Sequence, residues 1–150
     1  MQEITFTFDL EDHRKYKNNN LSNIEKNCYK ILNWLNNKSI KGTFFVVGDT
    51  AKKLSKLVKF INQNGHEVAS HGLDHTHLAN LNRRKFFEDV YKSKSILEDL
   101  IGNNIIGYRA PFFSLYPGTK WATEILTELK FKYSSSILSF VKALSILKAR

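Results

Sequence analysis

The sequence predicts an α/β domain built on parallel strands. Short strand-like segments alternate with helical segments along the whole chain, which implies a parallel sheet with right-handed crossovers. The 150 residues suit one domain, and 42% hydrophobic with 25% charged residues is a typical globular composition. An open doubly wound sheet and part of a β/α barrel both fit this alternation, and both place function at the carboxyl ends of the strands.

Five segments have the character of strands. Residues 3–8 alternate polar and apolar side chains, and residues 42–48 form an apolar run that begins and ends with glycine. Residues 67–70 lead directly into His71, and residues 105–108 lead into Arg109. Residues 132–137 are the fifth and last expected strand.

Helices are predicted between these strands. Apolar residues recur at helical spacing over residues 21–35, 54–61, 86–101 and 121–129. Asn64-Gly65 is expected to end the second helix, and Asn82 to cap the start of the third. Cys28 lies among apolar helical positions, where a small buried side chain is expected rather than a nucleophile.

Composition and charge exclude few functions. The net charge of +9 comes from 23 Lys+Arg against 14 Asp+Glu, but the lysines are scattered over expected solvent faces. Nucleic-acid binding is therefore a hypothesis supported by charge alone, and no nucleic-acid partner is expected. No signal peptide is visible and no apolar run approaches the roughly 20 residues of a membrane span. The sequence indicates a cytoplasmic protein without a membrane span.

Polar residues gather after successive strands. Asp9, Glu11 and Asp12 follow the first strand, His71 and His75 the third, and Arg109 the fourth. Because parallel strands end at the same rim of the sheet, these side chains are expected to converge. This convergence carries more weight than any single motif.

His71 and His75 are candidate metal ligands. At a spacing of four residues their rings can share one face of a helix or tight turn. Two imidazoles and one carboxylate suit zinc or another first-row divalent metal and leave a position open for water. Two unrelated surface histidines are the alternative interpretation.

The acidic residues could supply the remaining ligand and a base. Crowded carboxylates are unfavourable unless a cation or an arginine offsets their charge. One carboxylate could therefore bind the metal while another acts as general base. Taken alone, a solvated acidic turn would explain Asp9, Glu11 and Asp12 equally well. The Arg109-Ala110-Pro111 segment could likewise be a plain turn, although arginine offers a planar fork for orienting a carboxylate.

Together these segments resemble the polysaccharide deacetylase family, also called the NodB-homology domain or carbohydrate esterase family 4. The matching stretches are residues 7–12 (TFDLED), 43–48 (TFFVVG), 65–75 (GHEVASHGLDH) and 108–112 (YRAPF). Their order and spacing agree over residues 3 to 137. The resemblance implies a distorted (β/α) barrel and metal-dependent hydrolysis of acetyl groups on sugars.

The resemblance also implies a role for each site residue. Asp9 would be the general base, and Arg109 would orient it. The Phe112 amide would stabilise the oxyanion. His71, His75 and an aspartate, assigned as Asp12 with Glu11 as the alternative, would hold a divalent metal, with zinc preferred.

Three features depart from the family pattern. Leu10-Glu11 separates the two aspartates, as in a branch that reads Asp-x-Glu-Asp, and Gly72 replaces the usual hydroxyl residue after the first histidine. No histidine follows His77, although family members carry a late histidine as general acid. Residues after about 137 match nothing in the family, so residues 1–150 are expected to form the N-terminal part of a single deacetylase-like domain. The barrel would then be incomplete, with about five parallel strands.

The sequence thus predicts a carbohydrate deacetylase acting on N-acetylated sugars of a polysaccharide, peptidoglycan or lipid-linked glycan. We expect weak or no turnover from these 150 residues alone, because the late histidine is missing. An inactive remnant that binds metal or glycan is one alternative, and a hydrolase of small cyclic amides or formyl groups is another. Exposed edges of an incomplete barrel could also promote a homo-oligomer.

Overall fold

The computed structural model describes residues 5–12 and 21–137 as a parallel sheet with helices. Glu3, Ile4 and the C-terminal residues 138–150, which carry sequence predictions, lie outside the described residues. The strands are β1 (Phe6–Leu10), β2 (Gly42–Val46), β3 (Glu67–Ser70), β4 (Gly107–Tyr108) and β5 (Tyr133–Ser134). The α-helices are α1 (Ser22–Asn37), α2 (Gly48–Lys53), α3 (Ser55–Gln63), α4 (Arg83–Ile101) and α5 (Ala122–Glu128). Three short 3-10 helices are η1 (Leu78–Asn80), η2 (Pro111–Phe113) and η3 (Pro117–Thr119).

The five strands lie in the order in which they occur along the chain. Every neighbouring pair is parallel, from β1–β2 to β4–β5. A doubly wound sheet reverses its strand order at a switch point, whereas consecutive order without reversal is that of a β/α barrel. The predicted α/β fold with five parallel strands is confirmed. Within the described residues, β1 pairs only with β2 and β5 only with β4, so both edges of this sheet are open.

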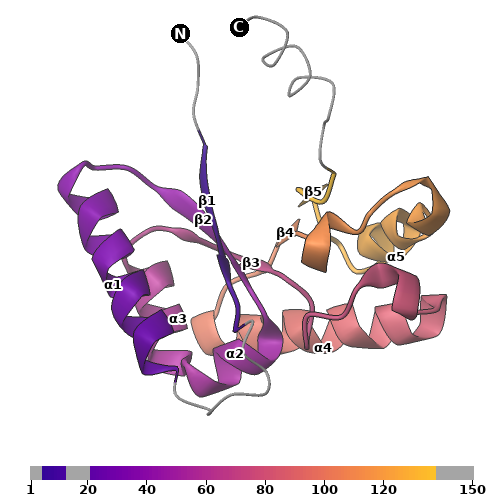
Figure 1. Ribbon diagram of the computed structural model, residues 1–150, viewed down its shortest axis with the longest axis horizontal. Coiled ribbons are helices and arrows are strands. Elements are labelled where there is room, and N and C mark those ends of the chain that lie inside the picture. The colour runs from indigo at the N-terminus through magenta and orange to yellow at the C-terminus, as the bar shows by residue number, and fades with distance from the viewer. Residues whose placement is uncertain (1–4, 13–20, 138–150) are drawn as a thin grey trace, which may run out of the picture.

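The helices form an arc around the strands. Figure 1 shows α1 and α3 on the left, α2 and the long α4 below, and α5 on the right. Successive helices of this arc contact one another, α1 with α3, α3 with α4 and α4 with α5. The other face of the sheet carries the strand side chains that point away from the helices.

Two apolar clusters join the helices to the sheet. The larger cluster lies between the first three strands and α1–α3, and its fully buried members include Leu32, Leu35, Leu57 and Ile61. The smaller cluster joins α4, α5 and β4, with Phe86, Val90, Tyr108, Ala122 and Ile125. Together the two clusters fix the positions of the strands, and so of their carboxyl ends, relative to one another.

The predicted helix ends are confirmed. The Asn82 side chain accepts a hydrogen bond from the Lys85 N–H and so caps α4. At the other end of α4, Gly102 takes the left-handed conformation, with φ of 70°, that ends many helices. Asn64 caps the end of α3 and Gly65 follows with φ of 75°.

The boundaries of several elements differ from the sequence prediction. The second strand ends at Val46 rather than at Gly48, because Gly48 begins α2, a short helix that the apolar pattern did not reveal. Gly48 packs so closely that an added Cβ would lie 3.1 Å from Leu73 Cδ1. β4 and β5 are only two residues long each, shorter than expected. Among the described residues, no helix combines the length and hydrophobicity that a bilayer crossing requires.

Cys28 is buried in the larger cluster, as predicted. Its thiol is free and its residue is 5% exposed. Burial raises the pKa of this thiol to about 12, so it stays protonated at neutral pH. The cysteine is therefore a small core side chain.

Candidate metal centre and catalytic residues

The first strand divides its side chains between the two faces of the sheet. Phe8 and Leu10 pack into the larger apolar cluster beside the helices. Since side chains alternate along a strand, Thr7 and Asp9 point to the opposite face. Glu11 directly follows the strand and lies on the side of Asp9, where both carboxylates approach His71. The period of two thus places a row of polar side chains away from the apolar core.

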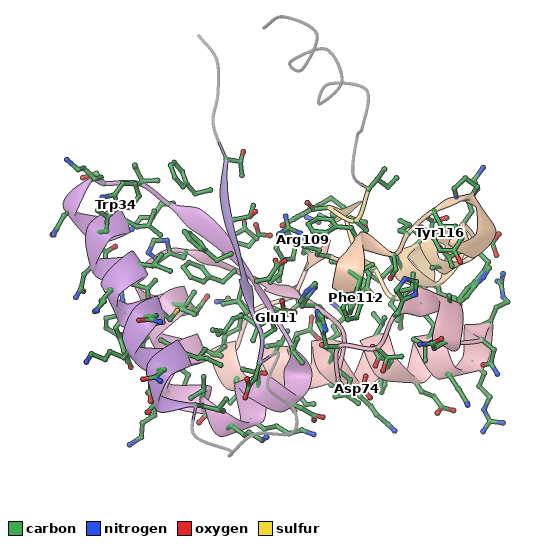
Figure 2. The ribbon with its side chains drawn as sticks, viewed as in Figure 1. Glu11, Trp34, Asp74, Arg109, Phe112 and Tyr116 are labelled. Carbon is green, nitrogen blue, oxygen red and sulfur yellow. The ribbon has the colours of Figure 1, made fainter. Side chains whose placement is uncertain are left out.

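Glu11, His71 and His75 meet at the carboxyl end of the sheet. One candidate ligand atom from each of the three lies within 4.8 Å of the other two. Glu11 Oε2 lies 3.4 Å from His71 Nε2 and directly contacts His75 Nε2. The two imidazole centroids are 5.0 Å apart. Figure 2 shows Glu11 near the middle of the molecule, with Arg109 and Phe112 beside it and Trp34 and Tyr116 at opposite ends.

The position of the proton on His71 follows from its contacts. His71 Nδ1 lies 2.8 Å from the carbonyl oxygen of Arg109. Because a carbonyl can only accept a hydrogen bond, Nδ1 must carry the proton and donate it. In the neutral ring, Nε2 then presents its lone pair toward the carboxylates of Glu11 and Asp9. A backbone carbonyl on the far nitrogen is a typical outer-shell support for a metal-binding histidine.

The electrostatics of Glu11 follow from its two histidines. Burial by itself would raise the pKa of this carboxyl. Hydrogen bonds and positive charge from His71 and His75 outweigh burial and hold the pKa of Glu11 well below its ordinary value. The carboxylate is therefore ionised over the whole physiological range.

Arg109 links the fourth strand to Asp9. Its side chain is buried, and Nη1 donates to Asp9 Oδ1 at 2.6 Å. Nη2 donates to Thr7 Oγ1 at 3.1 Å and to Ser135 Oγ at 2.9 Å, while Nε donates to the Ser135 carbonyl. The guanidinium also lies over the Phe45 ring, 4.0 Å from its centroid. These contacts leave the Asp9 carboxylate one well-defined orientation.

Phe112 lies beside the histidines in a strained turn. Its φ is 58°, in the left-handed region that is unfavourable for a bulky side chain. The residue is 59% exposed, and its ring centroid is 4.5 Å from that of His75. His75 itself has φ of 64°. Strained backbone of this kind persists where the surrounding structure holds it, and it is common at functional sites.

The structure brings together five of the six residues that the sequence singled out. Asp9, His71, His75, Arg109 and Phe112 all lie in this region. Asp12, which the sequence analysis assigned to the metal, is not in the group of close ligand atoms, although it lies within the described residues. Glu11 occupies that place, because it is on the same face of the chain as Asp9, two residues earlier.

Sequence reasoning missed the residues that hold Arg109. The Arg109 guanidinium contacts Thr7, Phe45 and Ser135. The neighbouring Ser136 holds the backbone after Arg109, because its hydroxyl accepts a hydrogen bond from the Ala110 N–H. Ser135 and Ser136 follow the last strand, so the rule that function lies at carboxyl ends could have marked them. Phe45 carries no such signal, because an aromatic residue in a buried strand is ordinary.

The donor set fits a divalent metal. Two neutral imidazole nitrogens and one ionised carboxylate are typical of catalytic zinc sites that leave a position open. The orientation of His71 favours ligation, because in the neutral ring the lone pair of Nε2 faces the Glu11 carboxylate. Asp9 also lies close to the three candidate ligands, since its Oδ2 is 3.9 Å from His71 Nε2.

Comparison with known proteins gives several peptidoglycan deacetylases among the similar proteins. A peptidoglycan-N-acetylglucosamine deacetylase of Bacillus cereus is 34% identical over 96 residues, covering 63% of this chain and 35% of that protein. The structure of the peptidoglycan N-acetylglucosamine deacetylase Bc1960 matches with a TM-score of 0.69 and 28% identity, over 88% of this chain and 55% of that one. A carbohydrate esterase family 4 pseudoenzyme from Bacillus anthracis shares the fold, with a TM-score of 0.73 at 17% identity, over 87% of this chain and 41% of that one.

The family model for polysaccharide deacetylase matches residues 2–133, a range that contains the six residues Asp9, Glu11, His71, His75, Arg109 and Phe112. The chain spans about a third of the length of the curated relative from Bacillus cereus. The match nevertheless covers most of this chain and agrees with its fold. The chain therefore belongs to the polysaccharide deacetylase family.

Proposed function

We propose that this chain carries the metal-binding half of a deacetylase that removes acetyl groups from N-acetylated sugars of peptidoglycan or a related polysaccharide. The observation that carries the proposal is the meeting of Glu11, His71 and His75 within 4.8 Å beside the Asp9–Arg109 ion pair. The substrate class is supported by the relatives named as peptidoglycan deacetylases. Zinc is the preferred metal, because the donor set has two imidazoles and one carboxylate.

Each protein group has a role in the proposed hydrolysis. Glu11, His71 and His75 would hold the metal, which polarises the acyl carbonyl and makes water more acidic. Asp9 accepts the proton of the attacking water as general base. Arg109 holds the Asp9 carboxylate in place, because its Nη1 donates to Asp9 Oδ1 at 2.6 Å. The Phe112 N–H would donate to the oxyanion, as the family resemblance implies.

The ligand set can be tested by metal analysis of the full 150-residue chain. The wild-type protein should retain about one zinc per chain after dialysis, as the three-ligand site implies. Glu11→Ala should lose the metal, and Asp12→Ala, the matched control at the next residue of the same turn, should keep it. Metal loss in Asp12→Ala but not in Glu11→Ala would return the ligand to Asp12. Equal retention in both variants would refute a site at this acidic cluster.

Catalysis can be tested on zinc-loaded protein with N-acetylglucosamine oligomers and peptidoglycan fragments. Acetate release should be slow, because the sequence offers no histidine after His77 as general acid. Asp9→Asn should lower the rate about a hundredfold or more while zinc content is unchanged. If Asp9→Asn and wild type release acetate equally fast, Asp9 is not the base.

A metal- and glycan-binding protein without turnover is the second candidate. The observation in its favour is again the absence of a histidine after His77. Zinc-dependent binding of N-acetylglucosamine oligomers with no acetate release above background would favour this function. Acetate release that disappears in Asp9→Asn would exclude it.

A further inference from the structure

A closed ring of buried hydrogen bonds lies directly behind the metal-binding turn. The Ser93 hydroxyl, on α4, donates to the Gly72 carbonyl at 2.9 Å. Ser93 Oγ also lies 2.9 Å from Ser70 Oγ, and the Gly72 N–H donates to Ser70 Oγ at 3.3 Å. Since the single Ser93 proton is directed to the carbonyl, Ser70 must be the donor to Ser93. The three groups therefore form one unidirectional ring that joins α4 to both polar groups of Gly72.

A second residue of α4 holds the next peptide of the same turn. Asp89 lies one helical turn before Ser93 and accepts a hydrogen bond from the Leu73 N–H at 3.0 Å. Gly72 has φ of 77°, and a Cβ added there would lie 3.1 Å from Asp89 Oδ2. A glycine at position 72, noted as a departure from the family pattern, is thus required by the backbone and by the carboxylate behind it.

The start of α2 closes the turn from the other side. The Gly48 N–H donates to the Gly72 carbonyl at 2.9 Å, and the Asp49 N–H donates to the Leu73 carbonyl at 2.8 Å. The Gly72 carbonyl therefore accepts from both Gly48 and Ser93. Every backbone polar group of residues 72 and 73 is held by a partner from α2, α4 or Ser70.

The ring immediately follows His71, and this position gives it a consequence for the metal site. Ser70 and Ser93 are both completely buried, where a hydroxyl is unfavourable unless it is hydrogen-bonded. An alanine would fill either place without that requirement, so packing alone does not explain the two serines. His71 is held at its ring by the Arg109 carbonyl and at its following peptide by the serine ring. Ligand geometry tolerates displacements of only about 0.2 Å.

We propose that Ser93 is a positioning residue for the metal site, acting with Ser70 through the Gly72 peptide to orient His71. The proposal rests on the function proposed above in so far as His71 is a metal ligand. It adds a residue of α4 that is outside the group of candidate ligands Glu11, His71 and His75. The hydroxyl ring determines the direction of the backbone after His71, and that direction determines where Nε2 points.

The first measurement concerns the metal-free protein. The imidazole nitrogens of His71 are observed by NMR at a pH where the ring is neutral, in the full-length wild type, Ser93→Ala and Ser95→Ala. Ser95 lies two residues further along α4 and is the matched control. Wild type and Ser95→Ala should show one tautomer with the proton on Nδ1. Ser93→Ala should shift the His71 signals toward a mixture of tautomers, and unchanged signals would overturn the proposal.

The second measurement is metal affinity, by competition with a chelator, together with the cobalt absorption spectrum. Ser93→Ala should weaken zinc binding about tenfold and alter the cobalt spectrum, whereas Ser95→Ala should change neither. Ser70→Ala should have a similar effect, and the double variant should be close to either single variant, because one break opens the ring. Additive losses would mean that the two serines act separately, which contradicts the ring.

A merely structural role has a different outcome. If Ser93→Ala lowers the thermal midpoint but keeps the His71 signals, zinc affinity and cobalt spectrum of the wild type, the positioning role is wrong. Should Ser93→Ala fail to fold, Ser93→Cys retains the volume with a weaker donor and should show the same changes to a smaller extent. Wild type that binds no metal would refute the proposed function, while the NMR comparison would still decide the positioning of His71.

Discussion

Two buried histidines lie at the two ends of strand β3 and differ in what they contact. His66 precedes the strand and is 3% exposed, and His71 follows it and is 2% exposed. His66 Nδ1 accepts a hydrogen bond from the Gly42 backbone N–H at 3.2 Å, so in the neutral ring its proton is on Nε2. His71 has the opposite tautomer, because its Nδ1 donates to a carbonyl. Only His71 therefore presents a lone pair to carboxylates.

The carboxylates at the two ends of the sheet also differ in the groups that they contact. At the amino end, Glu67 accepts a hydrogen bond from the Thr43 hydroxyl at 2.7 Å. Burial raises the pKa of Tyr133, and its hydrogen bond to Glu67 raises that pKa further, so the phenol stays protonated. At the carboxyl end, Glu11 and Asp9 meet imidazole and guanidinium groups instead.

The difference shows which feature distinguishes a structural site from a functional one. Histidine and a carboxylate occur at both ends of the sheet, so residue type does not decide between them. At the amino end His66 Nδ1 accepts from a backbone amide and Glu67 accepts from a hydroxyl group, while His66 Nε2 is buried without a hydrogen-bond partner among the described residues. At the carboxyl end, lone pairs and negative charge converge on one point, which favours a cation.

The largest expected contrast between the two ends is in metal affinity. His71→Gln removes a ligand and should weaken zinc binding by more than about 100-fold, since loss of even an outer-shell partner costs about 10- to 100-fold. His66→Gln should leave zinc affinity unchanged, because the glutamine oxygen can accept the Gly42 N–H. Chelator competition measures both. Equal weakening in the two variants would contradict the assignment of His71, and not His66, as a metal ligand.

A smaller effect is expected from crowding at the amino end. A Cβ added to Gly107 would lie 2.3 Å from the Tyr133 hydroxyl oxygen, so Gly107→Ala must displace the tyrosine. We expect a loss of about 1–3 kcal/mol in the free energy of unfolding, as for other overpacked sites, with zinc affinity unchanged. Denaturant titration of the metal-free protein measures the loss. Tyr133→Ala in the same chain should remove most of it, and an undiminished loss in the double variant would contradict the steric cause.

The smallest effect concerns pH. Burial, and then the nearby charge of Lys41, lower the pKa of His66 below its ordinary value. Above pH 6.5 this ring is neutral in both states and adds no pH dependence. As the pH falls below 6.5, the unfolded state binds a proton that the folded state resists, so stability falls by at most about 1.4 kcal/mol per pH unit.

The contribution of His66 is isolated by comparison with His66→Gln. The free energies of unfolding of wild type and variant are measured between pH 5 and 8 without metal. The wild-type curve should fall more steeply toward acid than the His66→Gln curve, while His71 and His75 contribute equally to both. Parallel curves would show that His66 titrates alike in the folded and unfolded states.

Much of the fold could be predicted because hydrophobic periodicity reflects burial. The helical stripes that became α1, α3, α4 and α5 pack into the two apolar clusters, and Asn82 caps α4 as its residue type suggested. Helix α2 was missed, because a segment of six residues is too short to show the helical period. Its start at Gly48 also depends on contacts with Leu73 and Ser93, which are distant in the chain. Strands β4 and β5 are short because few of their residues pair with a neighbouring strand. Such pairing depends on residues distant in the chain, so the local sequence pattern does not show it.

The sequence by itself determined the parallel α/β fold, because hydrophobic periodicity reflects burial. The resemblance of its motifs to the polysaccharide deacetylase family indicated the family and the segments whose polar residues form the site. Only the tertiary structure placed Glu11 rather than Asp12 beside His71 and His75, since the direction of a side chain after β1 depends on how that strand packs. It also decided the tautomers of His66 and His71, which depend on Gly42 and on Arg109, residues distant in the chain. Long-range partners determine a group's chemistry, and a local pattern carries no record of them.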